Sequence, residues 1–218
     1  RRPMARKVAG GSLGTIVLVL VGLYFGIDPG VILQSTGTLA PPSQTSHAPL
    51  SPEEKELGEF VSVVLADTED TWHAIFRQAG SQYREPKLVL FSGAVESACG
   101  YAQSATGPFY CPADEKVYID LSFFEDLQSR FGAPGDFAQA YVIAHEIGHH
   151  VQTLTGISGK VHAAKRQLSE RDANALSVRQ ELQADCFAGI WAYHADRSRQ
   201  ILEQGDIADI RRDVVTIV

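Results

Sequence analysis

The sequence predicts an α+β domain in which helices dominate, with a small sheet early in the domain and one transmembrane helix before it. Three observations predict this fold class. Apolar residues recur at helical spacing through most of the chain from about residue 136 onward, two short strand-like segments precede that stretch, and a long uncharged segment lies near the N-terminus. A chain of 218 residues has room for one such domain and an appendage.

The composition is that of a globular protein, with 44% hydrophobic and 21% charged residues. The formal net charge is −7, but residues 1–27 hold four basic residues and no acid, so all of the acidic excess lies in residues 28–218. Binding to phosphates needs clustered Lys and Arg side chains. The acidic body therefore disfavours nucleic acid, and we expect no such partner.

Residues 8–27 are 20 consecutive residues without a charge. A helix needs roughly 20 apolar residues to cross a bilayer, and basic flanks stay in the cytoplasm. We therefore expect residues 1–27 to be a basic flank and transmembrane anchor of a single-pass protein, with the N-terminus cytoplasmic and the domain extracytoplasmic. A cleaved signal peptide and a buried core helix are the alternatives, but no A-x-A-like cleavage site follows the segment.

Residues 28–50 are rich in Pro, Ser, Thr and Gly, and we expect them to be a linker. The domain then spans residues 51–218. It begins at Ser51, an expected N-cap, which is followed by a proline and by Glu54 at the reciprocal capping position. Apolar side chains at three- and four-residue spacing predict a helix from there to about Gly80.

Two short strands are expected next. Residues 87–91 (KLVLF) are apolar and bounded by polar residues, and residues 116–121 (KVYIDL) alternate between polar and apolar. The alternation predicts that the second strand is half-buried or lies at a sheet edge. The intervening residues 99–111 are expected to be irregular, and Ser122 is expected to begin a short helix.

The rest of the domain is predicted to be helical. A helix is expected from Asp136 to Leu154, with Gly156 as its stop signal. A long helical stretch is expected over about residues 160–196, and Asp206 is expected to cap a final helix.

The three cysteines suggest one disulfide. Cys99 and Cys111 lie in one stretch of the chain and could close a short loop in an oxidising compartment, although two free thiols are the alternative. Cys186 stands among apolar residues and is expected to be a buried thiol. No C-x-x-C pair is present, so a cysteine zinc cluster is disfavoured.

The sequence HEIGH at residues 145–149 matches H-E-x-x-H and lies within the helix expected over residues 136–154. Residues four apart share one face of a helix, so His145 and His149 can bind one metal ion. Glu146 lies beside them, where it can act as a general base on a metal-bound water. The alternative is a polar helix face with two unliganded histidines, but the apolar neighbours predict a buried helix, where unpaired imidazoles are costly.

A catalytic zinc ion usually has three protein ligands, and the sequence ELQAD at residues 181–185 offers the third. Glu181 and Asp185 share one face of a second helix. Glu181 can bind the metal while Asp185 accepts the outward N–H of a ligand histidine. The alternatives are an acid pair on a solvated face, or His162 or His194 as third ligand.

These segments together resemble a known family, the membrane-anchored neutral zinc metallopeptidases of bacteria, which are gluzincin-like. The resemblance rests on the anchor and on CGYAQSATGPFYCP, VYIDLSFF, AHEIGHHVQ and ELQADCFAG, which occur in family order and cover nearly the whole chain. It implies a zincin-like fold and one zinc ion. The site residues that it implies are the ligands His145, His149 and Glu181, the catalytic base Glu146, and Asp185 as the partner of a ligand.

The resemblance also suggests that the strand through Val117–Leu121 lies along the cleft, where a peptide could add as an antiparallel strand. Family members continue beyond the position of Val218, so the domain is expected to be cut short at its C-terminus.

The function expected from the sequence is zinc-dependent hydrolysis of a peptide bond in a peptide or protein substrate, at the bacterial cell envelope. Glu146 would take the proton of the attacking water and pass it to the leaving amine. Tyr193 and His194 are weak candidates for stabilising the oxyanion. The alternatives are a catalytically silent, zinc-stabilised binding or scaffold module, and a zinc amidase that acts on cell-wall material. Glu146 favours an enzyme, since a structural zinc site needs no general base.

Overall fold

The computed structural model describes residues 51–103, 107–124, 136–203 and 205–206, all of which belong to one compact unit, Leu50–Val218. The predicted anchor and linker, residues 1–50, lie outside the described residues. So do most of the helix expected from Ser122 and of the final helix expected from Asp206. None of the described helices is long and apolar enough to cross a membrane.

The described elements form a helix-rich α+β domain, as the sequence predicts. In chain order they are α3 (Pro52–Gln78), β1 (Lys87–Phe91), β2 (Ala94–Ser97), β3 (Gly100–Gln103), β4 (Phe109–Cys111), β5 (Lys116–Asp120), α5 (Asp136–Leu154), α6 (Ile157–Lys165) and α7 (Glu170–Arg199).

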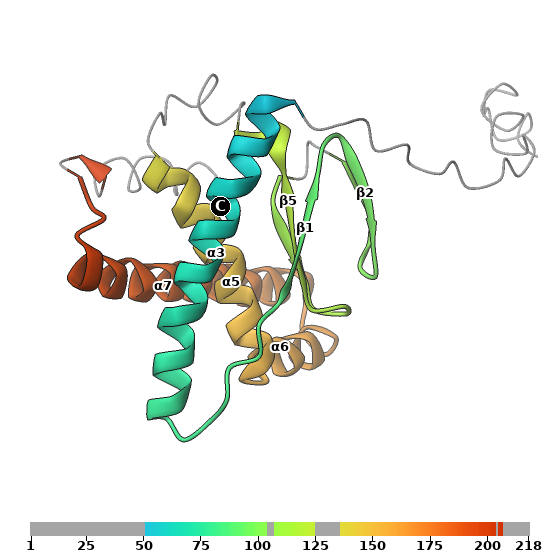
Figure 1. Cartoon of the computed structure of the whole chain (residues 1–218). Coiled ribbons are helices and arrows are strands. Elements are labelled where there is room, and N and C mark those ends of the chain that lie inside the picture. Colours follow the sequence, from blue (N-terminus) through green and yellow to red (C-terminus); the bar gives the residue numbers. More distant parts are fainter. Residues whose placement is uncertain (1–50, 104–106, 125–135, 204, 207–218) are drawn as a thin grey trace, which may run out of the picture. The chain divides into compact units, whose positions relative to one another are not determined.

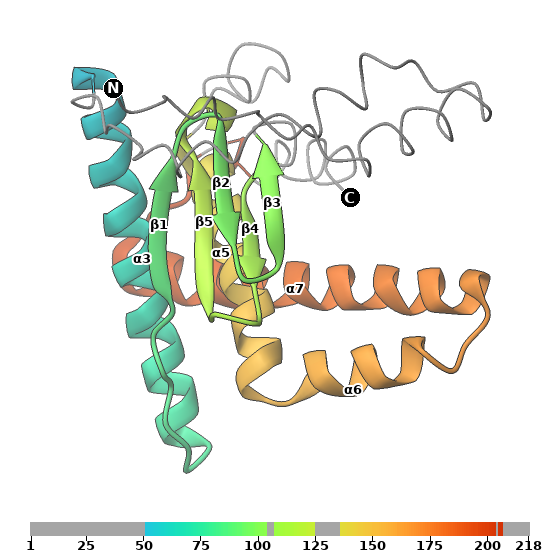
Figure 2. The same cartoon turned by 90° about the vertical axis from the view of Figure 1, so that its right-hand side faces the viewer.

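The strands form a three-stranded sheet and a separate hairpin. The sheet has the order β1-β5-β4, with β1 parallel and β4 antiparallel to β5, while β2 and β3 pair antiparallel with each other. Figures 1 and 2 show the helices α3 and α5 on one face of the sheet. The sequence predicted β1 and β5, but it treated the residues that form β3 and β4 as irregular.

The prediction that β5 is half-buried or at a sheet edge was wrong, because this strand is central and buried on both faces. Val117 and Ile119 belong to the core between the sheet and the helices. Tyr118 points to the other face and packs in a smaller cluster with Phe91 and Cys111. Its polar hydroxyl is accommodated because it donates a hydrogen bond of 2.6 Å to Asp114.

Helix α3 begins as predicted. The Ser51 hydroxyl accepts a hydrogen bond from the backbone N–H of Glu54, and the Glu54 carboxylate accepts one from the N–H of Ser51. This reciprocal pair satisfies two backbone donors that the helix itself leaves unpaired. The predicted stripe is buried against α5 and α7, and its buried members include Val61, Val64, Leu65, Thr68 and Trp72.

The expected helical stretch over residues 160–196 is in fact two helices, α6 and α7. They lie side by side and antiparallel, as Figure 2 shows. The chain turns between them because Ser169 caps α7: its hydroxyl accepts from the N–H of Asp172 and donates to the Asp172 carboxylate. The sequence analysis missed this N-cap signal.

Helix α5 is the central helix of the domain. It contacts α3, α6, α7, β4 and β5, and it ends before Gly156, whose φ of 75° lies in the left-handed region. The buried residues on it include Ile143, Ala144, Ile147 and Val151. A helix surrounded in this way can hold its side chains at fixed positions.

The predicted disulfide between Cys99 and Cys111 is present and joins the β2–β3 hairpin to β4. Cys111 is fully buried. The expectation of a buried Cys186 was wrong: its thiol is free and exposed, because it lies on the outward face of α7.

We expect the disulfide to stabilise the domain by about 3 kcal/mol, because closing the loop reduces the conformational entropy of the unfolded chain. Cys99→Ser together with Cys111→Ser should lower the free energy of unfolding by about that amount in urea titrations. Cys186→Ser is the matched control and should leave it unchanged. Equal urea midpoints for the double variant and the control would contradict this contribution.

Candidate metal centre

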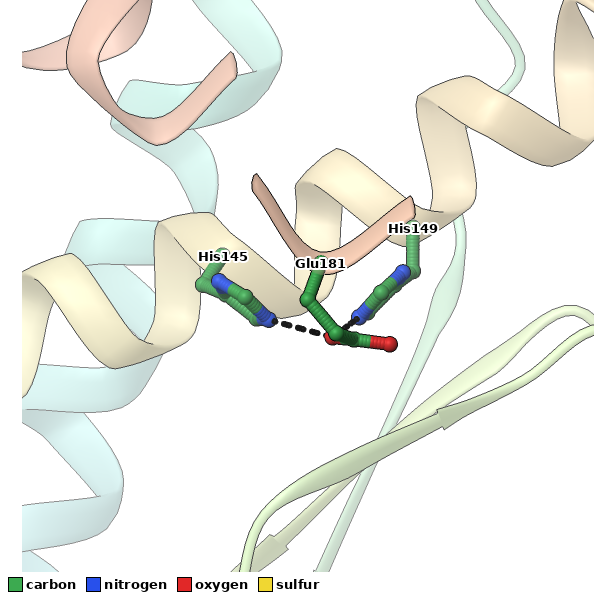
Figure 3. A group of neighbouring side chains, drawn as sticks. All are labelled: His145, His149 and Glu181. Carbon is green, nitrogen blue, oxygen red and sulfur yellow. Dashed lines mark ion pairs between the residues drawn. The ribbon is translucent and has the colours of Figure 1, made fainter. Parts of the chain in front are cut away.

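The two histidines of the H-E-x-x-H motif lie on one face of α5, one turn apart. The rings of His145 and His149 are perpendicular, with centroids 4.8 Å apart, and both side chains are mostly buried. Figure 3 shows both imidazoles directed toward the same point in front of the helix.

Glu181 reaches that point from α7. One of its carboxylate oxygens, Oε2, lies 3.0 Å from Nε2 of His149 and 3.4 Å from Nε2 of His145. Figure 3 shows the carboxylate between the two rings. One possible ligand atom from each of the three side chains lies within 4.8 Å of the other two. Within the described part of the chain, His145, His149 and Glu181 therefore form a group that could hold a metal ion. The alternative third ligands His162 and His194 do not belong to it.

Each histidine is oriented by an acceptor on its outer nitrogen. Nδ1 of His145 donates to Asp185 at 2.8 Å, as the spacing in ELQAD predicts. Nδ1 of His149 lies 3.0 Å from Oε1 of Gln152, whose amide nitrogen donates to the backbone carbonyl of Gln180. The amide nitrogen must face that carbonyl, so Oε1 is the atom that accepts from His149. In their neutral forms both histidines therefore present a bare Nε2 to the centre.

Gln152 is a site residue that the sequence analysis missed. It is fully buried and lies three residues after His149, on the same side of α5. A Gln one turn after the motif was the available signal, because a metal-binding histidine needs an acceptor for its second ring nitrogen.

Glu146 lies within the domain, with 8% of its surface exposed. Burial raises the pKa of its carboxyl, while the neighbouring His149 and His145 lower it in part. A carboxyl group whose pKa is raised by burial is better suited to exchange protons with water than an exposed one.

Charge pairing dominates the electrostatics of the three candidate ligands. Burial would lower the pKa of His145, but hydrogen bonds to Asp185 and Glu181 outweigh it and raise that pKa to about 10. The pKa of His149 is raised for the same reason, chiefly by Glu181. In turn, hydrogen bonds from the two histidines hold the pKa of Glu181 well below its usual range.

Gly148 explains how the two helices come close enough to form this group. A Cβ atom at this position would lie 2.8 Å from the backbone oxygen and 3.0 Å from the Cα atom of Ala184 on α7. The missing side chain therefore lets the backbones of α5 and α7 touch between the turns that carry the histidines and the acids.

His150, which follows His149 on α5, is fully buried. Its Nε2 lies 2.5 Å from the backbone carbonyl of Arg84, which can only accept, so this nitrogen carries the proton. Burial lowers the pKa of His150 and keeps the ring neutral, so Nδ1 accepts from the Tyr110 hydroxyl at 3.0 Å. His150 thus fastens strand β4 to the ligand helix.

Tyr193 and His194 are placed far along α7 from the candidate ligands. They follow Glu181 by 12 and 13 residues, which corresponds to about 18 Å of helix. Tyr193 is 56% exposed, and its hydroxyl accepts from Arg197. The structure therefore brings neither side chain to the centre.

The donor set fits zinc. Two imidazole nitrogens and one carboxylate oxygen are ligands that Zn²⁺ prefers, and three protein ligands leave a position for water or substrate. The acceptors on both outer ring nitrogens complete the arrangement found around zinc-binding histidines.

We expect Gly148→Ala to cost about 1–3 kcal/mol of stability, because the new methyl group overlaps the backbone of α7. To relieve the overlap, α7 should shift away from α5 and move Glu181 away from the histidines. Zinc affinity, measured by competition with a chelator, should therefore fall. Gly189→Ala is the control, since a Cβ there meets no atom within 4 Å. Unchanged zinc affinity in Gly148→Ala would show that the contact does not position the ligands.

We also expect zinc binding to release protons at neutral pH. The raised pKa values of His145 and His149 mean that the metal-free site holds protons on Nε2 that the metal must displace. Apparent zinc affinity should therefore rise with pH between 6 and 8. Calorimetry in two buffers of different ionisation enthalpy counts the protons, and a count of zero at pH 7 would contradict the assignment.

Comparison with known proteins agrees with this chemistry. The family model "Putative neutral zinc metallopeptidase" matches residues 3–214. "Uncharacterized protein YpfJ" of Escherichia coli (strain K12) is 50% identical over 199 residues, which are 91% of this chain and 68% of that protein. "Uncharacterized protein Rv2575" of Mycobacterium tuberculosis (strain ATCC 25618 / H37Rv) is 38% identical over 184 residues, 82% of this chain and 60% of that protein. No solved structure matches the chain significantly. The chain belongs to the neutral zinc metallopeptidase family.

Proposed function

We propose that the protein is a zinc-dependent endopeptidase that hydrolyses internal peptide bonds. The observation that carries the proposal is the burial of Glu146 beside two histidines whose Nε2 atoms converge with Glu181. A structural zinc site would have no use for an acid next to the ligands. The family membership supports zinc-dependent hydrolysis in general, and the geometry around Glu146 supports peptide-bond cleavage.

His145, His149 and Glu181 would hold the metal. When bound there, zinc supplies a Lewis acid that polarises a carbonyl and brings the pKa of a bound water down to about 7. Asp185 and Gln152 keep the two imidazoles aimed at the centre through their outer nitrogens.

Glu146 would act as the proton carrier of the reaction. Its carboxylate accepts the proton of the attacking water and later gives it to the nitrogen of the leaving amine. Burial favours the protonated form of this side chain and so lowers the cost of the intermediate stage in which Glu146 holds the proton.

Strand β4 is the element along which we place the substrate. The resemblance had assigned this role to the strand through Val117–Leu121, but Lys116–Tyr118 are already paired on both sides. β4 is an edge strand of the sheet, and its residue Tyr110 lines a cavity together with His149 and Glu181. An extended peptide could therefore add next to β4 and pass the candidate ligands.

We further propose that the domain works on the extracytoplasmic side of a bacterial membrane, held there by residues 8–27. The uncharged segment and its basic flank support this orientation. The disulfide between Cys99 and Cys111 also supports it, because such bonds persist in oxidising compartments.

Glu146→Gln tests the proposal. We expect this variant to retain zinc and to lose roughly 10²–10⁴-fold or more of the peptidase activity, since the amide cannot accept the proton. Zinc content and cleavage of a peptide library are measured on the same sample. Glu56→Gln, on the exposed face of α3, is the matched control and should cleave normally.

Three outcomes would contradict parts of the proposal. Unchanged cleavage in Glu146→Gln would remove the general-base role. A wild-type protein that holds zinc but cleaves no peptide and no cell-wall fragment would instead support the scaffold function. Cleavage of amide bonds in cell-wall fragments alone would support the amidase.

A further inference from the structure

A cavity of about 300 Å³ opens beside the candidate metal centre, on the side of His149 and Glu181. β4 and the turn after it, α6, and α7 form its walls. The remaining lining residues are Tyr110, Pro112, Ser158, Val161, His162, Lys165 and Gln180. A substrate bound at the metal would therefore have a neighbouring group inside this cavity.

Lys165 gives the cavity a positive charge. Its ammonium donates a hydrogen bond of 2.6 Å to the hydroxyl of Ser177 on α7, which fixes the end of an otherwise flexible side chain. Within the described ranges, no carboxylate lies within the 4.0 Å of Lys165 that defines an ion pair. An ammonium has three donors, so the contact with Ser177 leaves two of them for a ligand.

Glu181 does not neutralise this charge. It is the one acid among the lining residues, and its Oε2 atom is already engaged with both histidines. In the zinc-loaded protein the same carboxylate would be shared with a divalent cation. The cavity therefore presents a net positive charge to a substrate, although the domain as a whole is acidic.

We propose that this cavity binds a carboxylate of the peptide substrate, with Lys165 as the residue that selects it. The inference rests on the proposed peptidase function and adds the substrate class. The carboxylate belongs either to an Asp or Glu side chain next to the scissile bond or to the C-terminus of the peptide. Both sources offer the oxygen atoms that an ammonium group pairs with.

The other walls fit the same ligand. Val161 and Pro112 offer apolar surface to the methylene groups of a Glu side chain, while Gln180 and Ser158 add polar groups to the lining. A volume of about 300 Å³ is ample for one side chain and leaves room for water. Charged and apolar groups together in one concave site are typical of a specificity pocket.

Binding is measured by fluorescence anisotropy on zinc-loaded Glu146→Gln protein, so that no peptide is consumed. Four labelled peptides of otherwise equal sequence are compared: one with Glu, one with Gln and one with Lys at the variable position, all amidated, and the Gln peptide with a free C-terminus. We expect Kd for the preferred carboxylate peptide to be about tenfold lower than for the amidated Gln peptide, which corresponds to ~1.4 kcal/mol.

The charge of Lys165 is then varied in the same background. Lys165→Met should abolish the preference, and Lys165→Glu should reverse it toward the Lys peptide. Lys160→Glu is the matched control, since this exposed lysine of α6 does not line the cavity, and it should keep the wild-type preference. Raising the salt concentration should weaken the preference in the protein that retains Lys165.

The outcomes identify the source of the carboxylate and test the pocket assignment separately from the peptidase function. Tight binding of the Glu peptide over the free C-terminus assigns the pocket to a side chain and fits an endopeptidase. The opposite order assigns the pocket to the peptide end and would replace the endopeptidase by a peptidase that cleaves near the C-terminus. Equal Kd values for all four peptides, or an unchanged preference in Lys165→Met, would overturn the pocket assignment. Selective binding together with wild-type protein that cleaves none of the peptides would overturn the peptidase function and leave the pocket standing.

Discussion

The backbone contact between α5 and α7 at Gly148 is the constraint on which the site depends. The close approach to Ala184 allows a single turn of α7 to contact both ring nitrogens of His145. Asp185 contacts Nδ1, and Glu181 contacts Nε2. Glu181 on the same turn also contacts Nε2 of His149. A wider separation of the helices would lengthen all three contacts together, so the geometry of the site is a property of helix packing.

Charge pairing between His145, His149 and Glu181 ties the protonation of the candidate site to metal binding. Two histidines with raised pKa values surround a carboxylate with a lowered one, and this pairing offsets the cost of burying the two imidazoles. Zinc binding at this group, as proposed, would replace the positive charge of the protons by that of the metal.

Local sequence patterns predicted the features that depend on neighbouring residues. These include the cap of α3 at Ser51, the shared face of His145 and His149, and the acids of α7. Features set by distant partners were missed. β4 has only three residues and is held by pairing with β5, and the burial of Tyr118 depends on Phe91 from another strand. Period-two alternation cannot distinguish an edge strand from a central one whose second face is covered by a small cluster.

The position of β4 shows how such distant contacts govern the proposed chemistry. Three independent links fix this short strand: pairing with β5, the disulfide at Cys111, and the hydrogen bond from Tyr110 to His150 on the ligand helix. A strand of this length would not hold its place through ladder hydrogen bonds alone. Because the third link comes from the residue next to His149, the strand along which a peptide would lie and the metal centre that would act on it are positioned by the same helix. Under the proposed function, these links would couple substrate placement to the geometry of the candidate ligands without any residue of β4 binding the metal.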